Sequence, residues 1–153
     1  MIGLIIAVIF FNTVAFITVK QLTKSQMAHM WIFTILLHLL VDLYLGLKYH
    51  GYYYFNKGIE WIDLPAVTLI TPPVVLLFLN RFPFRDSFLK RFVYIILWSI
   101  VPVIYEALAL LPQPWGFFHY GWWKLTYSAI VYPVLLTIIV SYYMWICHLE
   151  KKN

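Results

Sequence analysis

Charged residues are scarce in this chain of 153 residues: they make up 11% of it, whereas hydrophobic residues make up 63%. A globular domain is roughly 45–50% apolar and about 25% charged. So few charges cannot cover the surface of a soluble domain of this length, and the composition therefore favours a membrane protein. The net charge of +5 does not indicate a nucleic-acid partner, because the basic residues stand in short groups between apolar runs.

Cysteine is nearly absent too, since Cys147 is the only one. An intramolecular disulfide is therefore excluded, and we expect an inert thiol near a helix end. The N-terminal stretch has neither the basic region nor the A-x-A-like site of a cleavable signal, and its apolar run is long. We interpret it as a retained first span.

Catalytic signatures are also missing. The sequence contains no G-x-S-x-G, H-E-x-x-H, P-loop or glycine-rich nucleotide loop. We therefore expect no catalytic residues and no cofactor, and the sequence points away from an enzyme without excluding one.

What the chain does have is long apolar runs. A bilayer core about 30 Å thick needs roughly 20 mostly apolar residues per helix, and unpaired backbone cannot face lipid. The sequence therefore predicts an all-α fold, a single domain over residues 1–153 that forms an integral membrane bundle of five transmembrane helices. The predicted spans are 2–19, 28–47, 61–79, 92–111 and 125–146.

The basic residues predict the orientation of these spans. Cytoplasmic loops carry an excess of lysine and arginine. One side of the bundle would hold eight of the eleven basic residues: Lys20, Lys24, Arg81, Arg85, Lys90, Arg91, Lys151 and Lys152. The other side would hold only Lys48, Lys57 and Lys124. We therefore expect the N-terminus outside and the C-terminus in the cytoplasm, with membrane lipids as partners.

Aromatic residues crowd the predicted outer boundary, where tyrosine and tryptophan settle at the headgroup level. We expect most of them to form an anchoring belt and a minority to form the mouth of a pocket. They are Tyr49, Tyr52, Tyr53, Tyr54, Trp61, Trp115, Trp122 and Trp123.

Polar side chains interrupt the apolar runs in a pattern. Asp42 lies five residues before the predicted outer end of the second span, about 7–8 Å along a helix, and Glu106 lies at a similar depth in the fourth. Intramembrane charges usually face the bundle interior and find partners. We therefore predict that polar stripes on three helices converge. The stripes are Thr34, His38 and Asp42; Ser99 and Glu106, with Tyr105 beside them; and Ser128 and Tyr132.

Three interpretations of this cluster stay open. In the first, the cluster is structural: His38 bonds Asp42 or Glu106 and fixes which helix faces meet. In the second, it is a binding site for a proton, an ion or a small ligand, because two carboxylates at one depth raise the pKa of at least one of them and a nearby histidine can share the proton. The third and least favoured interpretation is a metal site, which would need more than one well-placed histidine.

Prolines predict bends in three spans. Pro72 and Pro73 follow Thr71 in mid-span and remove two backbone donors, so the third helix should be kinked or broken there. Interrupted helices often mark transport sites, although a packing role is the simpler explanation. Pro102 and Pro133 suggest similar bends in the fourth and fifth spans.

Several short motifs follow one another in a fixed order along the chain. They are W-x-x-T (Trp31, Thr34), a lone Asp42 followed by YYYF, FLNRFP after the third span, YE (Tyr105, Glu106), and W-x-x-x-x-S-x-x-x-Y (Trp123, Ser128, Tyr132). This ordered set resembles a family of small uncharacterised multi-spanning membrane proteins of spore-forming Firmicutes. The resemblance implies a multi-pass protein of the bacterial plasma membrane, and it adds no catalytic residue.

The leading functional hypothesis is a small non-enzymatic membrane protein whose intramembrane polar site binds, passes or senses a proton, a cation or a small ligand. A structural or accessory subunit is the rival, in which the polar residues only hold helices together. A lipid-modifying enzyme acting near Ser128 or His119 is the third class. Five short helices enclose little volume, so we also expect a homo-oligomer or another membrane subunit as partner.

Overall fold

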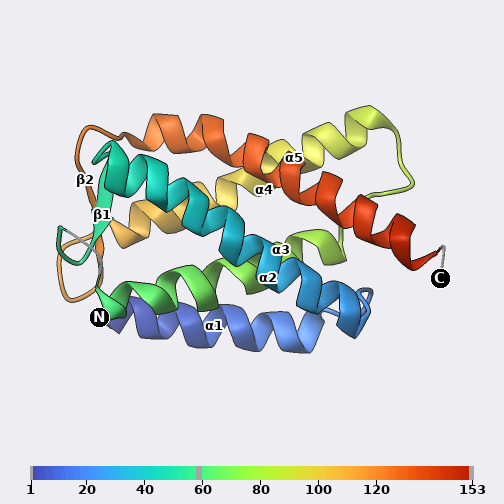
Figure 1. Cartoon of the computed structure of the whole chain (residues 1–153), viewed down its shortest axis with the longest axis horizontal. Coiled ribbons are helices and arrows are strands. Elements are labelled where there is room, and N and C mark those ends of the chain that lie inside the picture. The colour runs from blue at the N-terminus through green and yellow to red at the C-terminus, as the bar shows by residue number, and fades with distance from the viewer. Residues whose placement is uncertain (1, 58–59, 152–153) are drawn as a thin grey trace.

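The computed structural model describes residues 2–57 and 60–151, and it is an all-helical bundle with one short β-ribbon. Figure 1 shows the helices running side by side, with the ribbon at one end of the bundle together with the N-terminus and the C-terminus at the other. The α-helices are α1 (Ile2–Thr18), α2 (Lys24–Val41), α3 (Thr71–Asn80), α4 (Phe88–Ala109) and α5 (Leu125–Glu150). The strands are β1 (Tyr52–Tyr54) and β2 (Phe118–Tyr120).

Within residues 2–57 and 60–151, four helical stretches are long and apolar enough to cross a membrane: Lys24–Lys48, Trp61–Asn80, Phe88–Ala109 and Leu125–Glu150. The expected first span forms helix α1, which is also apolar but has only 17 residues and is shorter than these four stretches. Large apolar side chains cover the outside of the bundle, among them Phe16 at 72% exposure and Ile130 at 67%. The helical fold is thus confirmed, and its surface is one that lipid can solvate.

Helix α2 begins four residues before the predicted start because its N-terminus is capped. The Thr23 side chain accepts a hydrogen bond from the Gln26 backbone N–H, and the Gln26 side chain accepts one from the Thr23 backbone N–H. This T-x-x-Q capping box satisfies two backbone donors that would otherwise lack partners. At its other end α2 continues as a wider π-helical segment, Asp42–Lys48.

The third predicted span is helical from Trp61 to Asn80, and its helix type changes directly before the two prolines. A short 3₁₀ turn, Trp61–Asp63, and a π-helical segment, Ala66–Ile70, precede α3. Pro72 and Pro73 lie in the first turn of α3, where a missing backbone N–H is tolerated. Pro102 and Pro133, by contrast, stay inside the continuous helices α4 and α5.

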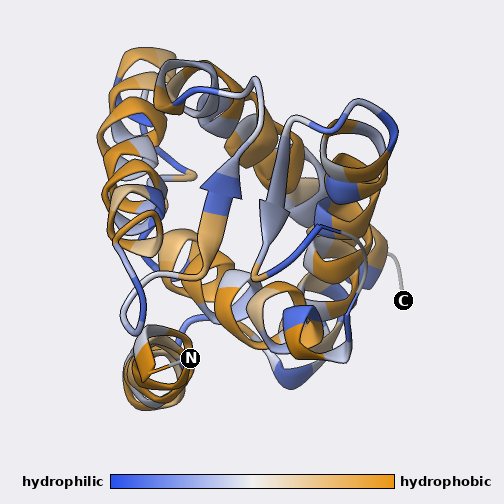
Figure 2. Ribbon diagram, turned by 90° about the vertical axis from the view of Figure 1, so that its left-hand side faces the viewer, coloured by the Kyte–Doolittle hydropathy of each residue, from blue (hydrophilic) through white to orange (hydrophobic). Residues whose placement is uncertain are grey.

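Sequence analysis did not predict the β-ribbon. Strands β1 and β2 pair antiparallel, with Tyr52 opposite Tyr120 and Tyr54 opposite Phe118. Figure 2 looks onto this end of the molecule and shows the two strands lying across the end of the bundle. Segments expected to be outer loops with an aromatic belt therefore form an ordered cap.

The core between the helices is built mainly from large apolar side chains. Helices α2, α3, α4 and α5 contribute to one cluster of buried residues, and α1 packs along α3 at the edge of the bundle. A smaller cluster lies nearer the β-ribbon, where Ala109 and Phe117 meet residues of α1 and of the segment that precedes α3.

A polar joint attaches α1 to α3. The Oδ1 atom of Asn80 accepts hydrogen bonds from the backbone N–H groups of Lys20 and Gln21, both at 3.0 Å. Its Nδ2 atom donates to the Thr18 carbonyl oxygen at 3.1 Å. A single buried amide thereby satisfies the backbone at the end of α1, where no intrahelical partners remain.

Candidate functional site

Glu106 is the centre of a polar cluster between α4 and α5. It is 6% exposed. The Ser128 hydroxyl donates to its Oε1 atom at 2.6 Å, the Tyr120 hydroxyl donates to the same oxygen, and the Tyr132 hydroxyl donates to Oε2. Trp123 supports the arrangement, because its indole N–H donates to Ser128 Oγ at 2.8 Å. The carboxylate thus receives three hydrogen bonds from neutral hydroxyl groups.

Asp42 and His38 form a second cluster on α2 and its π-helical extension. The Tyr52 hydroxyl donates to Asp42 Oδ1 at 2.6 Å, and the Tyr54 hydroxyl donates to Oδ2 at 3.2 Å. His38 Nε2 lies 3.1 Å from the Tyr54 hydroxyl and 3.6 Å from Asp42 Oδ2, while its Nδ1 lies 2.8 Å from Thr71 Oγ1. The stacking of His38 and Asp42 one turn apart is therefore confirmed.

The β-ribbon connects the two clusters. Directly opposed residues of an antiparallel pair point to the same face, as do residues two apart on one strand. Tyr52, Tyr54, Phe118 and Tyr120 therefore share the face that meets the helices. The residues between them lie on the other face, where the Tyr53 and His119 rings stack with centroids 5.2 Å apart.

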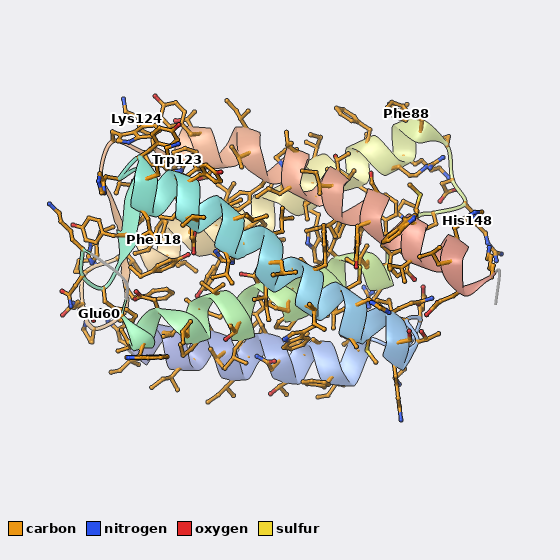
Figure 3. All side chains as sticks on the ribbon, in the orientation of Figure 1. Glu60, Phe88, Phe118, Trp123, Lys124 and His148 are labelled. Carbon is orange, nitrogen blue, oxygen red and sulfur yellow. The ribbon has the colours of Figure 1, made fainter. Side chains whose placement is uncertain are left out.

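Both clusters border one cavity of about 210 Å³ inside the bundle. Its lining residues on three helical elements extend over intervals of eleven residues, about 16 Å of helix each: 34–45, 98–109 and 128–139. Figure 3 shows Phe118 and Trp123, two of its wall residues, at the ribbon end of the molecule, opposite Phe88 and His148. The cavity is therefore narrow and runs from the ribbon toward the middle of the bundle.

Three buried polar atoms on the cavity wall have no hydrogen-bond partner within residues 2–57 and 60–151. They are Thr34 Oγ1, Trp98 Nε1 and Tyr105 Oη. Thr34 is only 2% exposed, so water outside the bundle does not reach it. A buried donor or acceptor without a partner costs about 1–3 kcal/mol. The hydrogen-bonding capacity of these three cavity-lining residues is thus unused in this structure.

The site contains carboxylates but few basic groups. The residues that line the cavity include no lysine or arginine in the described part of the chain. Burial, together with the nearby Asp42 carboxylate, raises the pKa of the Tyr52 and Tyr54 phenols well above their usual range. Burial and the hydrogen bond to Glu106 raise the pKa of Tyr120 in the same way. The ribbon phenols therefore stay neutral donors, and His38 is the one basic side chain in contact with either carboxylate in the described part of the chain.

Most of the predicted site residues gather at this cavity. Its wall includes Thr34, His38, Tyr105, Glu106, Ser128 and Tyr132. Asp42 lies behind this wall, held by the two tyrosines that line it. The carboxylates of Asp42 and Glu106 are at the same end of the bundle, but no hydrogen bond joins them in the residues described.

Ser99 makes no contact with the polar clusters in the residues described. Its hydroxyl donates to the Ile95 carbonyl oxygen one turn earlier at 2.7 Å, and the residue is not part of the cavity wall. Intrahelical bonding of this kind is a common alternative for a serine inside a helix. The seven-residue spacing from Glu106 placed it on a similar face but did not give it a partner there.

Sequence analysis missed five residues of the site. Trp98 and Thr71 stand in apolar or proline-rich contexts that give no signal for a polar role. Tyr52 and Tyr54 did give a signal, since the alternation of side chains along a strand would place these two tyrosines of YYYF on one face. The missed residues are Tyr52, Tyr54, Thr71, Trp98 and Tyr120.

No cluster of three or more histidine, cysteine, aspartate or glutamate side chains suited to a metal ion occurs in residues 2–57 and 60–151. Comparison of the chain with protein-family models, curated proteins and solved structures gave no match. The resemblance to a Firmicutes family therefore stays a prediction, and the functional interpretation rests on the site itself.

Proposed function

We propose that the chain is a multi-pass membrane protein of the bacterial plasma membrane, with its N-terminus outside and its C-terminus in the cytoplasm. The apolar helices and their exposed apolar surface support insertion. The eight-to-three distribution of basic residues supports the orientation. In this orientation the β-ribbon and both carboxylates lie toward the outer surface.

Cysteine labelling tests the orientation. In a Cys147→Ser background, Asn56→Cys places a thiol in the exposed loop after β1, and Asp86→Cys places one in the exposed loop before α4. A membrane-impermeant maleimide applied to intact cells should label Asn56→Cys and should label Asp86→Cys only after lysis. The reverse pattern would overturn the orientation.

We further propose that the protein binds a small ligand or cation in the cavity, as a carrier or sensor and without catalysing a reaction. The observation that carries this function is the buried Glu106 carboxylate facing a cavity whose wall also holds three unpartnered polar atoms. Sites for small molecules are usually concave and mostly apolar, with a few convergent polar groups. At about 210 Å³ the cavity is smaller than the roughly 300–1,000 Å³ of drug-sized pockets, so a small ligand suits it.

The structural-subunit function has one observation in its favour: each carboxylate already accepts hydrogen bonds from hydroxyl groups of its own cluster. A polar cluster that only holds helices together needs no more than these hydrogen bonds. A structural role does not require a cavity beside the cluster or unpartnered polar groups on the cavity wall, and for this reason we favour ligand binding.

Thermal unfolding of the purified protein in lipid nanodiscs tests ligand binding. The probes are octylamine, octanol, octanoate and the chlorides of sodium, potassium and magnesium. At least one should raise the unfolding midpoint of the wild-type protein, because a ligand that binds only the folded state stabilises it. The stabilisation should vanish in Val131→Phe, which fills the cavity wall on α5.

The matched control is Val134→Phe, which adds the same ring one turn further along α5 at a position 57% exposed on the outside. It should keep the wild-type response, and it also reports any effect of probe partitioning into the lipid. If no probe stabilises the wild-type protein, or if Val131→Phe responds as the control does, ligand binding in this cavity is wrong and the structural function remains.

A further inference from the structure

The two ends of the cavity differ in chemistry. Toward the ribbon lie Glu106 and, behind the tyrosines, Asp42; farther into the bundle lie Trp98 and Thr34. Thr34 precedes Asp42 by eight residues, and Trp98 precedes Glu106 by eight residues. Eight residues rise about 12 Å along a helix. Two helices therefore carry the same pattern, an acidic level and a neutral polar level about 12 Å apart.

The acidic level lacks a compensating cation. Its hydrogen-bond donors are phenol and serine hydroxyls, which carry no charge, and His38 is the one ionisable base in contact with either carboxylate among the described residues. Buried carboxylates are usually paired with a positive charge. The rings of Tyr52, Phe118 and Trp123 stand around this end of the cavity and add faces that attract cations.

Between the two levels the wall is mainly aliphatic, although His38, Thr71 and Tyr105 also line the cavity. Its aliphatic side chains neither donate nor accept hydrogen bonds, so an ion with a full hydration shell gains nothing from them. An apolar chain, by contrast, gains about 0.8 kcal/mol for each methylene removed from water. The aliphatic wall residues include Leu37, Val41, Val74, Val101, Val131 and Leu135.

The level of Thr34 and Trp98, deeper in the bundle, suits a neutral polar group. The Trp98 indole N–H can only donate, and the Thr34 hydroxyl can donate or accept. Neither has a partner in the described part of the chain, and Thr34 is almost fully buried. A hydroxyl, ether or carbonyl oxygen placed there would accept from Trp98 and bond to Thr34.

We infer that the ligand is an aliphatic amine with a neutral oxygen-bearing group at its far end. Its ammonium group would lie between the aromatic rings near Glu106 and Asp42, its chain along the aliphatic wall, and its oxygen at Thr34 and Trp98. This inference rests on the ligand-binding function proposed above and narrows it to one chemical class.

The nanodisc assay tests the inference with probes of one chain length: octylamine, 8-amino-1-octanol, octanol and octanoate. Both amines should stabilise the wild-type protein, and the other two should not. Removing the charge with Glu106→Gln should weaken binding of both amines at least tenfold. Shortening the amine should weaken it about fourfold for each methylene lost.

Thr34→Val tests the deep level separately, because it keeps the shape of the side chain and removes the unpartnered hydroxyl. In the wild-type protein 8-amino-1-octanol should bind about fivefold more tightly than octylamine, the gain typical of one hydrogen bond. In Thr34→Val that advantage should shrink to less than twofold while octylamine binding stays unchanged. This comparison holds even if Glu106→Gln fails to fold.

Two results would overturn the inference while leaving ligand binding intact. One is octanol or octanoate binding as tightly as octylamine, which would mean that the carboxylates do not select a cation. The other is sodium, potassium or magnesium stabilising the protein as well as octylamine does, which would make the site an inorganic ion site. Failure of every probe would overturn the proposed function itself.

Discussion

Tyr52 and Tyr120 lie directly opposite each other across the β-ribbon, and the hydroxyl group of each donates a hydrogen bond to a different carboxylate. Tyr52 bonds to Asp42 of the second helix and Tyr120 to Glu106 of the fourth. The ribbon is therefore a part of the site as well as its cover, because it holds the two acidic groups at one end of the bundle.

Replacing Glu106 should destabilise the bundle. Glu106→Leu removes the acceptor of three hydroxyl donors. Interhelical bonds in membranes average about 0.6 kcal/mol, but buried donors left unpaired cost about 1–3 kcal/mol each. We expect a loss of about 2–4 kcal/mol in unfolding free energy in detergent, and a smaller loss for Glu106→Gln, which keeps one carbonyl acceptor. Asp86→Asn, in an exposed pair with Lys90, is the control and should change stability by less than about 1 kcal/mol.

Alkaline pH should weaken the fold through Tyr52. Burial and Asp42 raise the pKa of its phenol in the folded protein above the unfolded value of about 10. Above pH 10 the unfolded chain therefore holds fewer protons than the folded one, and stability falls as pH rises. The stabilisation is fully present below pH 10. The unfolding midpoint measured from pH 8 to 11 should fall less steeply in Tyr52→Phe than in Tyr49→Phe, whose ring is 53% exposed; equal slopes would contradict this account.

Asn80 should control the attachment of α1. Asn80→Ala removes three hydrogen bonds to the end of that helix, and we expect it to cost about 1–3 kcal/mol. Hydrogen exchange should rise in residues 2–18 and stay unchanged in α5. Asn80→Asp keeps the acceptor for Lys20 and Gln21 but loses the donor to Thr18, so its effect should be intermediate. Uniform loss of protection across all helices would show that α1 is not a separable element.

Gly121 should tolerate no side chain. A Cβ atom there would lie 2.3 Å from the His50 carbonyl oxygen and 3.1 Å from that of Gly51. Gly121→Ala must therefore shift the backbone next to Tyr120 and loosen its bond to Glu106. We expect a lower unfolding midpoint and, if the cavity binds octylamine, weaker binding of it. Gly46→Ala is the comparison, because its Cβ would meet only ordinary contacts, 3.4 Å and longer, with Tyr52.

Hydropathy and charge were sufficient to predict the helices, because an apolar run of about 20 residues has few other solutions in lipid. Helical periodicity likewise placed His38 over Asp42 and Ser128 near Tyr132. It could not predict the ribbon, since β1 and β2 are far apart in the chain and their pairing depends on how the helices first pack. For the same reason Tyr52 was assigned to an aromatic belt and Tyr120 was given no role. Ser99 shows a different limit: a correct face does not decide which acceptor a hydroxyl takes.

The hydrogen-bond partners of each carboxylate follow it closely along the chain. Asp42 is bonded by Tyr52 and Tyr54, ten and twelve residues later, and Glu106 by Tyr120, Ser128 and Tyr132, within 26 residues. During synthesis each acidic helix would thus meet its own donors soon after it leaves the ribosome. The two halves can enter the lipid as separate, internally satisfied units, and the closing of the ribbon is then the late step that joins them into one protein.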